Sequence, residues 1–137
     1  MTATEALQGW LAVEHEAVWL YPVIGARLDQ LTERARASHD AHLRTRDHLL
    51  NRLQVLDVEP VPAKLSYAVG SMRTPEQATR LARRLEQAVA AACLTFAGET
   101  SDQDDQKYAI TRLRRAAEAE LTWGGRPRAF PGLPSQP

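Results

Sequence analysis

The sequence has little cysteine and no long hydrophobic run. These two features argue against an intramolecular disulfide and against a membrane-spanning helix. Its only cysteine, Cys93, lies in an apolar stretch, so an intramolecular disulfide is excluded and a small core side chain is expected rather than a reactive thiol. The longest nearly apolar stretch, 17–26, is roughly half of what a membrane-spanning helix needs. The first residues lack a basic region and an apolar core, so we expect no signal peptide and a cytoplasmic protein.

An excess of charge of either sign is also missing. Seventeen basic and seventeen acidic residues give a formal net charge of zero, so no overall field attracts nucleic acid or a membrane, and we expect neither partner. The arginine clusters at 80–84 and 112–115 favour solvated helix faces over a nucleic-acid site. Only two of the basic residues are lysines, and the others are arginines. This preference, together with abundant alanine, is typical of a GC-rich bacterial genome.

What the sequence does contain is a helical pattern. A chain of 137 residues with 44% hydrophobic residues suits one domain with a sizeable core. Apolar residues recur at spacings of three and four over four segments, which predicts helices over about 4–27, 30–56, 75–97 and 101–123. Thr74, Pro75 and Gln77 form a capping pattern at the start of the third helix, and Gly98 is its expected stop.

The same spacing predicts which faces are buried. The first helix presents Leu7, Leu11, Glu14, Val18, Tyr21, Gly25 and Leu28, and we expect Pro22 to kink it. The second presents Leu31, Ala35, Ser38, His42, Thr45, Leu49 and Leu56; the fourth presents Ile110, Leu113, Ala117 and Leu121. His15 and His48 fall off these faces and are expected at the surface.

The connections suggest the arrangement of the helices. The first and third are short, whereas the segment 57–73, interrupted by Pro60, Pro62 and Gly70, is long enough to run the length of a bundle. Short, long, short connectivity is typical of ferritin-like bundles. We therefore predict an all-α, ferritin-like antiparallel four-helix bundle over residues 1–125, with a long crossover between helices 2 and 3. A proline-rich tail, 126–137, packs on the bundle or extends from it, pinned by Phe130 and Leu133.

Three stretches also resemble a known family. They are the Glu14-His15-Glu16-Ala17-Val18 run with Tyr21 and Gly25, His42 with Arg46-Asp47, and the closing Phe130-Pro131-Gly132-Leu133-Pro134. Together they resemble a small bacterial ferritin-like domain family of unknown function, over essentially the whole chain. The resemblance implies the ferritin-like fold and no particular activity.

A di-iron ferritin-like centre takes one Glu from each of two helices and a Glu-x-x-His pair from each of the other two. Glu14 and Glu86 match the single glutamates. The second helix offers His39 and His42, with His39 where glutamate is expected, and the fourth helix has no histidine. The remaining set, Glu14, His39, His42 and Glu86, is chemically suited to one divalent ion, either Fe, Mn or Zn.

Three interpretations of this set stay open. The sequence favours a structural hydrogen-bond network completed by Arg46 or water, in a non-catalytic binding or structural domain with a degenerate metal site and no cofactor. The alternative is a single-metal protein capable of redox chemistry; a di-metal oxidase is the least favoured. A further possibility is a small-ligand carrier, with Pro22 loosening the first helix to open a pocket.

The first helix carries more apolar surface than a bundle helix needs. Trp19, Leu20, Val23 and Ile24 extend it nearly all round. We expect the crossover and the tail to cover part of this surface. The rest predicts a homodimer through Trp19 and Val23, or an interface for an unknown protein partner.

Overall fold

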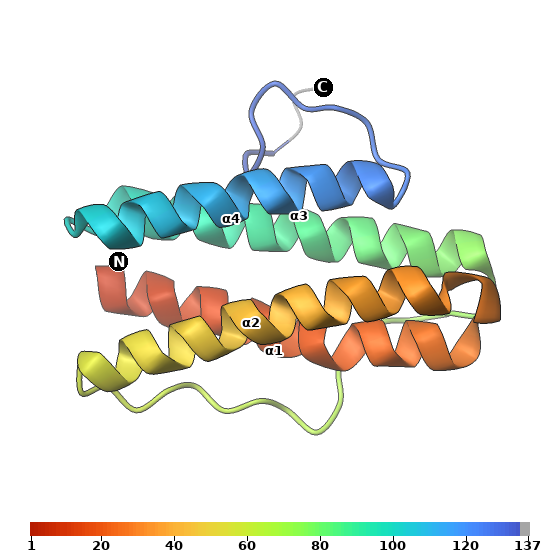
Figure 1. The fold of residues 1–137 in the computed structure, drawn as a ribbon, viewed down its shortest axis with the longest axis horizontal. Coiled ribbons are helices and arrows are strands. Elements are labelled where there is room, and N and C mark those ends of the chain that lie inside the picture. Colours follow the sequence, from red (N-terminus) through yellow and green to blue (C-terminus); the bar gives the residue numbers. More distant parts are fainter. Residues whose placement is uncertain (135–137) are drawn as a thin grey trace.

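The computed structural model describes residues 1–134, and its regular structure in that range is entirely helical (Figure 1). The elements are α1 (Ala3–Arg27), the 3-10 turn η1 (Asp29–Leu31), α2 (Thr32–Val55), α3 (Pro75–Glu99) and α4 (Gln103–Thr122). The predicted all-α four-helix bundle is therefore confirmed. None of the helices in residues 1–134 is both long and apolar enough to cross a membrane.

Side chains at the helix starts explain where the helices begin. Thr2 and Glu5 form a reciprocal capping box at α1, and Thr74 and Gln77 form the predicted one at α3. At α4, the Asp102 carboxylate accepts a hydrogen bond from the amide of Asp105. The ends are less well predicted, because α3 continues through Gly98 to Glu99.

A long segment, 56–74, joins α2 to α3 and carries the chain back along the bundle, so α2 and α3 run in the same direction (Figure 1). It covers part of α1, as expected: Tyr67 packs against Trp19, with ring centroids 5.7 Å apart. It also buries His15, whose Nε2 lies 2.9 Å from the carbonyl oxygen of Val61. The prediction of a surface His15 was therefore wrong, because helical spacing takes no account of what a crossover covers.

The tail lies on the other side of the molecule, over α3 and α4 rather than α1 (Figure 1). Arg128 donates a hydrogen bond from Nε to the buried carboxylate of Glu120, 3.0 Å away. Phe130 and Leu133 are 70% and 51% exposed, so they do not pin the tail as expected. Residues 135–137 of the predicted tail lie outside the described part of the chain.

The homodimer through Trp19 and Val23 stays a prediction.

The core consists of two apolar clusters with a polar layer between them. One cluster includes Leu7, Trp10, Leu11, Leu49, Leu53, Val89 and Phe96. The other includes Leu20, Ile24, Leu28, Leu31, Ala82, Leu85 and Trp123. Between the two sets lie Glu14 on α1, His42 on α2 and Glu86 on α3, all buried; His15, also buried on α1, bonds to the crossover instead. The charged layer thus sits at mid-height, with apolar packing on both sides.

The buried face of α4 differs from the predicted one. The helix buries Asp105, Ala109, Ala116 and Glu120, while Ile110 and Leu121 are 40% and 44% exposed. The two buried carboxylates explain the shift. Arg52 pairs with Asp105, with 2.9 Å from Nε to the nearer oxygen, and the tail pairs with Glu120. A pattern that counts only apolar residues assigns such paired acids to the surface.

Candidate functional site

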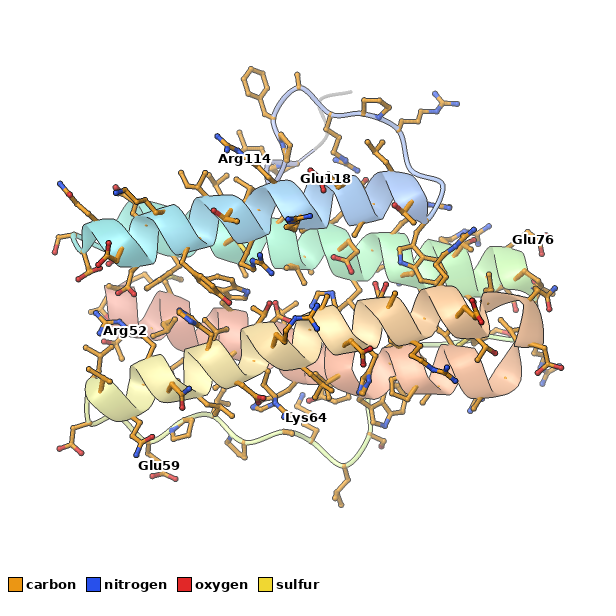
Figure 2. The ribbon with its side chains drawn as sticks, in the orientation of Figure 1. Arg52, Glu59, Lys64, Glu76, Arg114 and Glu118 are labelled. Atoms are coloured by element: carbon orange, nitrogen blue, oxygen red, sulfur yellow. The ribbon has the colours of Figure 1, made fainter. Side chains whose placement is uncertain are left out.

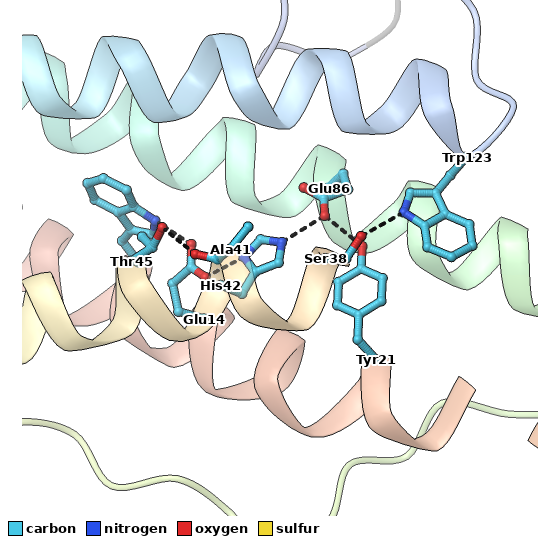
Figure 3. Close-up of polar contacts among 9 residues, drawn as sticks. Glu14, Tyr21, Ser38, Ala41, His42, Thr45, Glu86 and Trp123 are labelled. Carbon is cyan, nitrogen blue, oxygen red and sulfur yellow. Dashed lines mark hydrogen bonds and ion pairs between the residues drawn. The ribbon is translucent and has the colours of Figure 1, made fainter. Parts of the chain in front are cut away.

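The centre of the polar layer is a histidine held between two carboxylates. Glu14 and Glu86 are each 1% exposed and His42 is 7% exposed. His42 Nδ1 lies 2.5 Å from Glu14 Oε2, and His42 Nε2 lies 2.7 Å from Glu86 Oε1 (Figure 3). We refer to Glu14, His42 and Glu86 as the central triad.

This geometry sets the protonation state of the histidine. A neutral imidazole has one N–H to donate, whereas an imidazolium donates from both nitrogens. Burial lowers the pKa of His42, but the charges and hydrogen bonds of Glu14 and Glu86 outweigh burial and raise the pKa from 6.5 to about 10. His42 is therefore a buried cation at neutral pH, and it donates one hydrogen bond to each carboxylate.

Aromatic side chains also donate hydrogen bonds to the two glutamates. Trp10 Nε1 donates to Glu14 Oε1 at 3.0 Å, and the Tyr21 hydroxyl donates to Glu86 Oε1 at 2.6 Å. Burial, followed by the charge of Glu86, raises the pKa of Tyr21 well above 10, so the phenol stays a donor. The carboxylates thus receive fixed donors from α1 as well as from His42 on α2.

Aromatic stacking holds the histidine ring in place. Tyr21 stacks on His42 on one side, with ring centroids 5.5 Å apart, and on Trp123 on the other, at 5.7 Å. Trp123 in turn donates from Nε1 to the hydroxyl of Ser38, 3.3 Å away, which ties the end of α4 to α2 (Figure 3). The triad is therefore oriented by rigid rings rather than by flexible side chains.

A cleft of about 230 Å³ between α2 and α4 reaches this centre. Its lining includes all three members of the triad, together with Arg34, Ala41, Thr45, Arg112, Ala116 and Ala119. Contacts near its ends come from the bond between Ser38 and Trp123 and the ion pair between Arg52 and Asp105. Small residues on α4 leave the space between these contacts unfilled, so the cleft reaches the triad from one side.

The structure brings together three of the four predicted site residues. Glu14, His42 and Glu86 form the triad, whereas the His39 side chain is 27% exposed, with Nδ1 3.8 Å from Asp40 Oδ1. Arg46 pairs with Asp47, so the expected role of Arg46 in the network was wrong.

Several residues of the site were missed because their individual patterns carry no chemical signal. Trp10 and Trp123 look like ordinary apolar core residues in the sequence, and Tyr21 looks like a bundle position. Their polar atoms, however, all point into the centre or its flank. The sequence does offer one cue for Trp10, which precedes Glu14 by four residues. Residues four apart are neighbours on one face of a helix, so the two side chains can meet.

Both ring nitrogens of His42 are engaged within the triad. A metal binds the lone pair of a deprotonated imidazole nitrogen, but both nitrogens of His42 face carboxylates at hydrogen-bond distance. Within residues 1–134, no group of three or more His, Cys, Asp or Glu side chains is placed to hold a metal. The imidazolium itself supplies the positive charge between the two glutamates.

Comparison with known proteins places the chain in a family. Residues 6–135 match the family model described as Domain of unknown function (DUF4439), and the chain belongs to that family. The fold is similar to the crystal structure of a conserved hypothetical protein, rv2844, from Mycobacterium tuberculosis, with a TM-score of 0.82 and 25% sequence identity. That similarity covers 88% of this chain and 93% of the other. No curated protein matches the sequence.

Proposed function

We propose that this protein is a non-catalytic, ferritin-like binding domain whose charged centre works without a metal ion and whose binding site is the cleft between α2 and α4. The parallel direction of α2 and α3, joined by a long crossover, supports the ferritin-like layout. The engagement of both His42 nitrogens by Glu14 and Glu86 carries the proposal.

The physical reason is the balance of charge. Two carboxylates buried together are costly without a cation, and a metal ion supplies that cation in a di-iron protein. Here a protonated His42 occupies the position between the carboxylates, which removes the need for a metal. The domain then offers no redox centre, and its accessible feature is the cleft.

The alternative is one Fe, Mn or Zn ion on Glu14, His39, His42 and Glu86. It requires His42 to lose a proton and His39 to turn from Asp40 toward the centre. The two functions differ in what the purified protein carries, so they are separable by experiment.

The test is metal analysis of protein purified after growth with added iron, manganese or zinc, combined with thermal melts before and after adding each metal. We expect metal far below one ion per chain and an unchanged melting temperature. One metal ion per chain that is lost in His42→Ala and retained in His48→Ala, a change on the same helix outside the triad, would contradict the proposal. Native mass spectrometry of the same sample tests the binding role, because a small molecule held in the cleft adds a defined mass.

A further inference from the structure

One arginine on the wall of the cleft, Arg112, has a buried hydrogen-bond donor that lacks an acceptor in the described part of the chain. Arg112 on α4 lines the cleft, and its guanidinium lies over the Tyr108 ring at 5.6 Å. Its Nε is fully buried and has no hydrogen-bond partner within residues 1–134. Arg52, by comparison, pairs with a buried aspartate. A buried donor without an acceptor is unfavourable, so a ligand acceptor that draws the Arg112 guanidinium into the cleft would relieve this cost.

The deep end of the cleft has the opposite character. Both hydrogen bonds to Glu86, from Tyr21 and from His42, fall on the same oxygen, Oε1 (Figure 3). The other oxygen, Oε2, accepts no bond from any residue in the described part of the chain. The triad also places two carboxylates on either side of one imidazole ring. A hydrogen-bond donor with positive charge therefore complements this end.

The space between the two ends is apolar and elongated. Ala41, Val89, Ala116 and Ala119 line it. The hydrogen bond from Gln87 to Glu120 places these two residues at the same height on α3 and α4. Arg112 lies eight residues before Glu120, and Glu86 is next to Gln87. At 1.5 Å per residue, Arg112 and Glu86 are therefore about 12 Å apart along the helix axis. The cavity volume of about 230 Å³ exceeds the roughly 150 Å³ of an engineered cavity that binds benzene.

We propose that the cleft binds a small, elongated amino carboxylate. Its carboxylate pairs with Arg112, its aliphatic body lies along the alanines, and its amino group donates to Glu86 Oε2. The proposal rests on the binding function proposed above and assigns the chemical class of the ligand.

Four eight-carbon probes separate the three parts of the ligand: 8-aminooctanoate, octanoate, octylamine and 1-octanol. Isothermal titration calorimetry on the full chain gives each affinity at concentrations below micelle formation. We expect 8-aminooctanoate to bind most tightly, and the loss of either charged end to weaken binding about tenfold or more. 1-Octanol should bind most weakly.

Matched variants on α4 locate the site. Arg112→Gln should reduce the affinity for 8-aminooctanoate to that for octylamine. Arg114→Gln, the same charge change on the exposed side of the same helix, should have no effect (Figure 2). Ala119→Leu should abolish binding by filling the cleft, whereas Ala117→Leu, which lies outside the cleft lining, should not.

The outcomes distinguish a failure of the ligand class from a failure of the binding role. If 1-octanol binds as tightly as 8-aminooctanoate and Ala119→Leu blocks both, the cleft binds apolar molecules and the assigned class is wrong, while the binding function stands. If Arg112→Gln lowers stability without ligand and leaves all four affinities unchanged, Arg112 serves only the charge balance of the centre and the proposal is overturned. If no probe binds and native mass spectrometry finds no added mass, both proposals fail.

Discussion

The two sides of the bundle differ in how their helices meet. α1 and α3 are joined across the core by the bond between Tyr21 and Glu86 and by packing of Trp10 on Phe96, whose ring centroids are 5.9 Å apart. α2 and α4 leave a cleft along the central part of their interface. We call these the closed side and the open side.

The difference lies in the side chains that α4 presents to the centre. In a di-iron bundle each helix contributes ligands to the centre. Here α1, α2 and α3 complete a charge network of their own, and α4 presents Ala116 and Ala119 at that level. These small residues leave space beside the triad, which explains the cleft.

The largest expected effect comes from breaking the closed side. His42→Ala leaves two buried carboxylates without their cation, so we expect the free energy of unfolding to fall by about 3–5 kcal/mol. His39→Ala, one turn away and partly exposed, should change it by less than about 1 kcal/mol. Urea denaturation measures both. Equal losses would place His39 in the centre and contradict the assignment of the triad.

Stability should also fall as pH rises above neutrality. The pKa of His42 is raised from 6.5 to about 10 in the folded protein, so the folded state binds the extra proton between these values. The stabilisation is complete below pH 6.5 and is lost as pH rises through about 10. Between pH 7 and 9 we expect a slope approaching one proton, at most about 1.4 kcal/mol per pH unit. Urea titrations across this range measure the slope; a flat dependence that matches His42→Gln would contradict it.

The same substitution on each side tests the difference in packing. Ala17 on α1 is completely buried, so Ala17→Leu overpacks the core, and we expect a loss of about 1–3 kcal/mol. Ala119→Leu on α4 extends into the cleft and should cost less than about 0.5 kcal/mol. Thermal or urea unfolding gives both values. A large loss at Ala119 would mean that the open side is packed as tightly as the closed one.

The smallest effects concern two glycines outside the centre. Gly132 in the tail has φ +89°, and an added Cβ would lie 2.9 Å from the carbonyl oxygen of Ala90. Gly132→Ala should loosen the tail by about 1 kcal/mol and speed trypsin cleavage after Arg128 several-fold. Gly98→Ala has open space within α3 and should stabilise the protein by about 0.5–1 kcal/mol. Cleavage at the wild-type rate in Gly132→Ala would show that the tail does not depend on this contact.

Much of the fold follows from local rules in the sequence. The capping box at Thr74 and the long proline-containing segment 57–73 predicted where α3 begins and which connection is long. Glu14, His42 and Glu86 were found because they match ligand positions of a di-iron four-helix bundle.

The rest depends on long-range pairing that periodicity does not record. Asp105 and Glu120 are buried because Arg52 and Arg128 reach them from other segments, which displaced the predicted face of α4. His15 is buried only because the crossover passes over it. The partnerless Nε of Arg112 became visible only once the surroundings of the side chain were known.

The most direct test of the account is the protonation state of His42. Heteronuclear NMR of the histidine side chains, recorded from pH 6 to 9 on metal-free protein and again after adding zinc, reports on each ring nitrogen separately. We expect both His42 nitrogens to stay protonated throughout and zinc to leave them unchanged. A nitrogen that loses its proton near pH 6.5, or one that binds zinc, would show that the imidazolium is not the cation of this site.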